Sequence, residues 1–162
     1  MSASMQFIKI ENIHGGFSLN PEPYLDILPS LQASLPEGAA RFASDPDHYN
    51  FFGSRCIKDL QLGSISLSDK VGLLAVVIVL APSQFKHEQA LEISYSDVVQ
   101  FDVSAKEWRG VGEIWPETRR LGDVQLDEIL PHEHGCSHEL QCTRGCLRII
   151  ARDLSATWFS PE

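Results

Sequence analysis

The apolar run at residues 71–81 (VGLLAVVIVLA) limits the fold of this chain more than any other stretch. A membrane-spanning helix needs about 18 or more such residues, so the run is too short to cross a bilayer. Its second half is rich in β-branched residues, and Pro82 follows it directly. These features favour a central β-strand that is covered on both faces.

Further strand patterns lie on both sides of this run. Residues 56–67 predict a strand before it, which ends in a turn at residues 68–70. Residues 90–95 alternate apolar and polar side chains, and residues 99–103 repeat the pattern after a turn at residues 96–97. The middle of the chain is therefore expected to be almost entirely β.

The C-terminal part continues this pattern. Residues 122–130 predict another strand, and residues 137–142 pair with residues 146–152 in a hairpin whose turn uses Gly145 for a positive φ. The chain then has seven or eight short strands, with connections too short for crossover helices. We expect an α+β fold that is mostly β, built as an antiparallel sheet or sandwich-like domain.

The N-terminal part differs because it is rich in proline. Residues 6–10 predict a short first strand, which ends before the Gly15-Gly16 pair. Residues 24–28 predict one or two helical turns that Pro29 breaks or kinks, and residues 36–43 predict a second short helix that opens with proline. This part is expected to form a helical cover over the sheet.

Length and composition bound the class of protein. The 162 residues indicate one domain, with residues 1–53 as N-terminal strand and helical cover and residues 54–162 as β-rich core. Hydrophobic residues at 43% and charged residues at 22% are typical of globular domains. The N-terminus has no basic region followed by an apolar core, and four cysteines are too few for a disulfide scaffold. We expect a cytoplasmic protein with reduced thiols.

The formal net charge of −9 is concentrated in one segment. Residues 88–139 hold twelve Asp or Glu and four Lys or Arg. Such a surface repels nucleic acid and phosphate-rich membranes and favours a basic protein partner. The alternative interpretation is that the charge only keeps the protein soluble.

The stretch at residues 131–146 (PHEHGCSHELQCTRGC) concentrates side chains that bind zinc. The candidate ligands are His132, His134, Cys136, His138, Cys142 and Cys146. The favoured set takes Cys142 and Cys146 from the hairpin, with two ligands from the other four. The spacing matches no named metal motif, so a solvated loop or ordinary packing remains the alternative.

Catalytic signatures are sparse by comparison. The chain lacks G-x-S-x-G, HExxH and a glycine-rich phosphate loop. Cys136 and His138 supply a nucleophile and a base, but the sequence identifies no third group that orients them. A non-enzymatic function is favoured, and a zinc-stabilised domain or metalloenzyme is the alternative.

Candidate partner-binding residues lie in and after the segment at residues 105–120. Trp108 and Trp115 flank two glycines there and are of the type found at interface hot spots. The carboxylates expected to form a charged rim around these anchors are Asp123, Asp127, Glu128 and Glu133. The alternative is that both tryptophans fold back on the sheet.

A partial resemblance concerns residues 54–104. The pieces Lys58-Asp59-Leu60-Gln61-Leu62 and Val98-Val99-Gln100-Phe101, with an apolar strand between them, resemble the H-D-x-x-L opening and V-x-x-F ending of small bacterial cytoplasmic proteins that include proposed immunity proteins of toxin systems. Lys58 replaces the histidine of that opening. The resemblance implies a non-enzymatic protein that binds and neutralises a partner such as a toxin, and it transfers no single residue.

Overall fold

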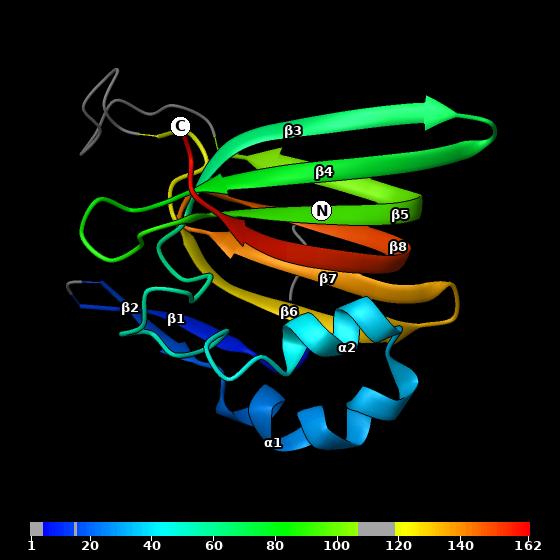
Figure 1. Cartoon of the computed structure of the whole chain (residues 1–162). Helices are drawn as coiled ribbons and strands as arrows, with labels where there is room; N and C mark the ends of the chain where they lie inside the picture. Colours follow the sequence, from blue (N-terminus) through cyan, green and yellow to red (C-terminus); the bar gives the residue numbers. More distant parts are fainter. Residues whose placement is uncertain (1–4, 15, 107–118) are drawn as a thin grey trace.

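The computed structural model describes residues 5–14, 16–106 and 119–162. Its main element is a six-stranded antiparallel sheet in the order β3-β4-β5-β8-β7-β6, so the fold is mostly β, as predicted (Figure 1). The strands of this sheet are β3 Gln61–Lys70, β4 Leu73–Ala81, β5 Ala90–Ala105, β6 Val124–His132, β7 Gly135–Cys142 and β8 Gly145–Phe159. The N-terminal part contributes a separate hairpin, β1 Lys9–Ile13 and β2 Gly16–Asn20, and the helices α1 Glu22–Leu31, η1 Gln32–Ser34 and α2 Glu37–Ala43.

The sheet is divided into two halves that share its longest strands, β5 and β8. Strand β4 pairs with β5 only at residues 91–95, whereas β7 pairs with β8 only at residues 145–151. Between these regions β5 bends, with Asp97 at a φ of 49° and a register shift between Val98 and Gln100. The turn predicted at residues 96–97 is therefore wrong, because β8 pairs with β5 on both sides of the bend and keeps it one strand.

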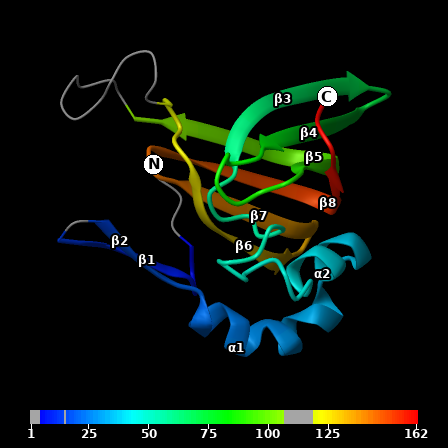
Figure 2. The ribbon, with the colours of Figure 1, turned by 60° about the vertical axis from the view of Figure 1, so that its left-hand side comes forward.

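The outer strands of the sheet meet at one end. Gln61 forms a bridge with Asp123, the Asp59 amide donates to the Val124 carbonyl at 2.8 Å, and the Val124 amide donates to the Leu60 carbonyl at 2.8 Å. These contacts join the start of β3 to the start of β6. The curved sheet thus closes partly on itself and surrounds its own core (Figures 1 and 2).

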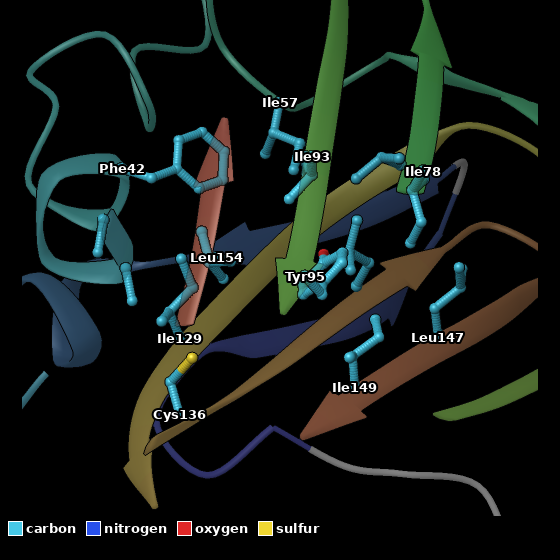
Figure 3. Close-up of a cluster of buried hydrophobic side chains, with 14 of the residues drawn as sticks. Phe42, Ile57, Ile78, Ile93, Tyr95, Ile129, Cys136, Leu147, Ile149 and Leu154 are labelled. Atoms are coloured by element: carbon cyan, nitrogen blue, oxygen red, sulfur yellow. The ribbon is translucent and has the colours of Figure 1, made fainter. Parts of the chain in front are cut away.

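The core lies on the inner face of the curved sheet. Figure 3 shows Tyr95 in the middle of the cluster, between Leu154 on one side and Leu147 and Ile149 on the other. Along β4 only alternate residues such as Ile78 are buried, and the residues between them are half-buried. The prediction of a strand covered on both faces is therefore wrong, because the outer face of β4 has no complete second layer over it.

The helical cover packs near β6 and β8 (Figures 1 and 2). The Asp153 carboxylate accepts hydrogen bonds from the backbone amides of Gly38 at 3.1 Å and Ala39 at 2.9 Å. These amides lie in the first turn of α2, where the helix itself offers them no acceptor. Pro29 was predicted to break or kink the helix, and it lies inside α1 without breaking it. The helix ends at Leu31, so the hydrogen bond that Pro29 cannot donate is one of the last in the helix.

Other strand limits differ from the predicted ones. Strand β3 starts at Gln61 and runs through residues 68–70, where a turn was expected. Strand β6 continues through Pro131, which an edge strand tolerates because it has one free side. The predicted positive φ of Gly145 is wrong. A glycine is needed at this position because a Cβ atom would lie 2.2 Å from the Ser104 carbonyl oxygen. Among the described residues, no helix is long and apolar enough to cross a membrane.

The turn between β3 and β4 is strained. Val71 and Gly72 have φ values of 57° and 76°, the signs that a two-residue type I′ hairpin requires. Positive φ is unfavourable for a β-branched residue, and the Val71 side chain is 99% exposed, so no packing offsets the strain.

We expect Val71→Asn to stabilise the protein. Asn-Gly is the preferred type I′ pair, and relief of the strained φ should raise the free energy of unfolding by about 1 kcal/mol in urea titrations. Val99→Asn is the matched control, since Val99 is exposed on a strand and lacks a positive φ. A gain in the control as large as in the turn variant would contradict the strain explanation.

Candidate functional site

The predicted zinc ligands on β7 are divided by the alternation of the strand. Cys136, His138 and Cys142 point into the core and are at most 2% exposed. Cys146 pairs in register with Gln141, which alternates with these residues, so Cys146 lies on the opposite face of the sheet. The two hairpin cysteines that were expected to bind one ion therefore point apart.

The other two predicted ligands lie at the turn between β6 and β7. The His134 ring nitrogen Nε2 donates to the Asp97 carbonyl at 2.8 Å, and the His134 amide donates to His132 Nδ1 at 3.1 Å. These bonds fasten the turn to the bend in β5. They leave His132 and His134 away from the buried sulfur atoms on β7.

The residues predicted to bind zinc do not assemble a site. In the described part of the chain, which includes all six candidates, no three His, Cys, Asp or Glu side chains could hold a metal ion together. Burial raises the pKa of Cys136 and of Cys142 to about 12, so both remain thiols. This also argues against Cys136 as a nucleophile activated by His138.

The polar group that the core does contain is centred on Asp127, whose side chain is inaccessible to solvent. One carboxylate oxygen of Asp127 lies 2.7 Å from His48 Nε2, and the other lies 2.7 Å from His138 Nε2. The second nitrogen of His48 lies 2.8 Å from the Phe42 carbonyl oxygen, and that of His138 lies 2.6 Å from the Tyr95 hydroxyl. We call Tyr95, His138, Asp127 and His48 the Asp127 network.

The hydrogen-bond partners determine the protonation states. Both nitrogens of His48 face oxygen acceptors, the Asp127 carboxylate and a carbonyl, so both carry a proton and the ring is an imidazolium. His138 donates from Nε2 to Asp127, and its Nδ1 lies 2.6 Å from the Tyr95 hydroxyl. The network thus contains the buried ion pair of Asp127 and His48, extended by His138 and the Tyr95 hydroxyl.

The directions of the pKa shifts agree with this assignment. Burial alone raises the pKa of Asp127, but the charge of His48 and hydrogen bonds from both histidines hold it well below its usual range. Burial lowers the pKa of His48, and Asp127 more than reverses this, so the net shift is upward. Burial also raises the pKa of Tyr95 well above its usual value, which keeps it a phenol and a donor.

Three further contacts fix the N-terminal part to β6. The Tyr24 hydroxyl donates to the Ile129 carbonyl at 2.6 Å, and the Tyr49 hydroxyl donates to the Asp127 carbonyl at 2.7 Å. The Glu128 carboxylate accepts hydrogen bonds from the amides of residues 6–8 at 2.8–3.0 Å. Because protein atoms bond every oxygen and nitrogen of the Asp127 network and bury it, its chemistry is structural: it attaches the cover to the sheet.

The predicted charged rim is only partly on the surface. Asp127 is 0% and Glu128 is 2% exposed, so their assignment to a rim is wrong, since β6 turns both carboxylates to buried partners. Asp123 is half-buried and accepts a hydrogen bond from Gln61 at 3.0 Å. Glu133 is exposed at the turn between β6 and β7. Trp108 and Trp115 lie outside the described residues.

A second buried polar cluster joins two loops. The Ser83 hydroxyl lies 2.6 Å from His87 Nδ1, and His87 Nε2 donates to the Cys56 carbonyl at 2.8 Å. The Ser83 hydroxyl therefore donates to a neutral ring, and burial lowers the pKa of His87. A serine beside a histidine has the elements of a nucleophile and its base. Ser83 is only 3% and His87 8% exposed, so the pair serves to attach loop 82–89 to the loop around Cys56.

Comparison of the chain with protein-family models, with curated proteins and with solved structures gave no match. The resemblance to immunity proteins therefore stays a prediction.

Sequence reasoning missed His48 and Tyr95 as members of one network. The local pattern gave no signal for them, because alternation in the predicted strand VQLDEIL places Asp127 on the face opposite Val124 and Leu126. The register shift between Val124 and Leu126 changes this alternation and was not predictable from the strand pattern. The partner His48 lies 79 positions earlier in the chain.

We expect Asp127→Asn to destabilise the protein by about 3–5 kcal/mol, because it leaves the His48 imidazolium buried without its counter-charge. Urea unfolding at pH 6 measures this loss. Asp123→Asn is the matched control and should cost about 1 kcal/mol or less. If Asp127→Asn does not fold, Asp127→Asn with His48→Gln should recover folding, since it removes both charges. Equal effects of the two single variants would contradict the assignment.

The pH dependence of stability provides a separate test of His48. Its folded pKa is raised, so the folded state keeps a proton that the unfolded state releases near pH 6.5, and stability falls as the pH rises from there to the folded pKa. The slope is up to about 1.4 kcal/mol per pH unit. Asp127 has a lowered pKa, so its contribution is present above about pH 4 and is lost as the pH falls toward the folded pKa. His48→Gln should remove the slope above pH 6.5, whereas His14→Gln, at an exposed position, should keep it.

Proposed function

We propose that this chain is a non-enzymatic binding domain that attaches to a basic protein partner and neutralises it. The observation that supports this most is the exposure of two phenylalanine rings on adjoining loops: Phe52 is 97% and Phe85 is 78% exposed. Large exposed aromatic side chains near one another are typical of protein–protein interfaces.

The two loops that carry these rings are held together by hydrogen bonds. The Lys86 ammonium donates to the Phe51 carbonyl at 2.9 Å and to Asp59 at 2.8 Å. The contact from His87 to the Cys56 carbonyl lies on the same pair of loops. A rigid loop loses little conformational entropy when it binds, so these contacts favour Phe52 and Phe85 as anchors.

The charge of the neighbouring helical cover indicates what kind of partner fits. Residues 20–50 carry five exposed carboxylates and a single guanidinium, that of Arg41. We call the five carboxylates the acidic surface: Glu22, Asp26, Glu37, Asp45 and Asp47. Glu133 is exposed on the turn between β6 and β7, and the ribbon views show this turn beside α2 (Figures 1 and 2).

The acidic surface and the two phenylalanine rings have different roles in the proposed binding. Exposed carboxylates steer a basic partner during encounter and stabilise the correct orientation, whereas desolvated aromatic rings supply most of the affinity. Asp45 and Asp47 precede Phe52 in the same loop, so the charge continues up to one anchor. Binding would neutralise the partner by covering its basic surface, which is the function that the resemblance to immunity proteins implies.

Binding is favoured over catalysis because the buried acid–base groups of the chain are bonded to other protein atoms. The Asp127 network and the Ser83–His87 pair hold several such groups in the described part of the chain, and both are enclosed by the protein. Their hydrogen bonds are made to other protein atoms. A reacting substrate needs a group that is free to accept or donate a proton.

The proposal is tested by quantitative co-purification from the source cells, with the full chain as bait. The double variant Phe52→Ser, Phe85→Ser should lower the recovery of a captured basic protein at least about tenfold, because each ring removes hot-spot energy. The double variant Asp45→Lys, Asp47→Lys should lower recovery more at low salt than at high salt, because salt screens exposed charge.

The matched control is Val99→Ser with Val103→Ser, which changes two exposed apolar residues on β5. This control should retain the same partner as the wild-type chain. The proposal is contradicted if the captured proteins are acidic, or if the phenylalanine variant retains them as well as the control does.

A further inference from the structure

A cleft lies between the β1–β2 hairpin and the ends of β6 and β7. Its volume is about 550 Å³, within the range of about 300–1,000 Å³ that small-molecule sites occupy. Ile8 and Phe17 supply apolar lining from the N-terminal part, and Gln125 and Gln141 supply amides from the sheet. The loops that carry Phe52 and Phe85 do not line it, so the cleft is separate from the proposed partner surface.

Gln125 is the unusual residue of this cleft. The residue is only 6% exposed, and its side-chain amide forms no hydrogen bond with any residue that the structure describes. The amide atoms themselves are not fully buried, so they reach the solvent in the cleft and are available to a ligand there. Gln125 also lies at an irregularity of the sheet: its neighbours Val124 and Leu126 pair with consecutive residues of β7, and Gln125 itself has no partner residue there. Such a β-bulge redirects a side chain, often beside a binding site.

The charged residues of the cleft favour an anion. Lys9 and Lys106 line it with exposed side chains, and Glu11 is the one carboxylate among its lining residues. No ion pair joins either lysine to another described residue. In a chain with a net charge of −9, this is a local excess of positive charge. The Phe17 ring, 46% exposed, adds a flat apolar wall.

We propose that this cleft binds a small organic anion with a flat, hydrogen-bonding body. The Gln125 amide offers one donor face and one acceptor to an amide-like edge of the ligand. Lys9 and Lys106 meet its phosphate or carboxylate group, and Phe17 packs against its ring. The inference is independent of the proposed partner binding, since the two surfaces share no residue.

Two probes separate the possible anionic groups: adenosine 5′-monophosphate carries a phosphate on a flat base, and orotate carries a carboxylate on one. Isothermal titration with the full chain should detect at least one of them. Gln125→Leu should weaken that binding at least tenfold, and Lys9→Gln with Lys106→Gln should weaken it by a similar factor and reduce its salt dependence. Gln125→Leu should unfold at a temperature close to that of the wild type, because the amide has no hydrogen bond to a described residue that the substitution could remove.

Gln100→Leu, a change of an exposed glutamine on β5, is the matched control and should leave binding unchanged. Inorganic phosphate is the second control and should bind more weakly than the organic probe. The proposal is overturned if neither probe binds, if Gln125→Leu binds as tightly as wild type, or if inorganic phosphate binds as tightly as the organic anion. Co-purification of the protein partner with Gln125→Leu should be unchanged, so failure here does not affect the partner proposal.

Discussion

The buried carboxylate of Asp127 is the constraint on which the arrangement of this fold depends. A carboxylate without a partner in the core would cost several kcal/mol, so the sheet alone cannot bury it. His138 and Tyr95 come from neighbouring parts of the sheet, but the counter-charge comes from His48, outside it. The N-terminal part must therefore pack where His48 reaches Asp127, and apolar contacts alone would define that position less well, because they are not directional.

The buried ion pair of Asp127 and His48 also positions exposed residues of the loop that carries His48. His48 lies directly after Asp45 and Asp47 and a few residues before Phe52, so its bond to Asp127 fixes the loop that carries them all. Glu128, the next residue of β6 after Asp127, points to the opposite face and is buried there by the N-terminal segment, where its carboxylate accepts hydrogen bonds from the amides of residues 6–8. The acidic character of residues 88–139 thus predicted only part of the acidic exterior, because Asp127 and Glu128 are buried. Five exposed carboxylates lie on the helical cover, and others lie elsewhere, for example Glu88 and Asp102.

Local patterns predicted the strands, because alternation and apolar runs act within a few residues. They did not predict the sites, because pairing across the sheet decides which side chains meet. The six candidate zinc ligands are neighbours in sequence, yet alternation and register separate Cys142 from Cys146 and keep His134 at the turn. Conversely, His48 and Asp127 are 79 positions apart and touch, because the cover packs beside β6. Turns failed for a related reason: the pairing of β8 continues past Asp97, so the predicted turn becomes a bend.

Two polar residues on β6 show how a structural group differs from one available to a ligand. Asp127 and Gln125 are both at least nine-tenths buried and lie two positions apart. Every oxygen of the Asp127 carboxylate has a protein partner, so its burial is compensated within the fold. The Gln125 amide has none among the described residues, and the bulge directs it toward an open cleft. An amide that faces an open cleft without a protein partner is available to bind a ligand, whereas the fully bonded carboxylate of Asp127 is not.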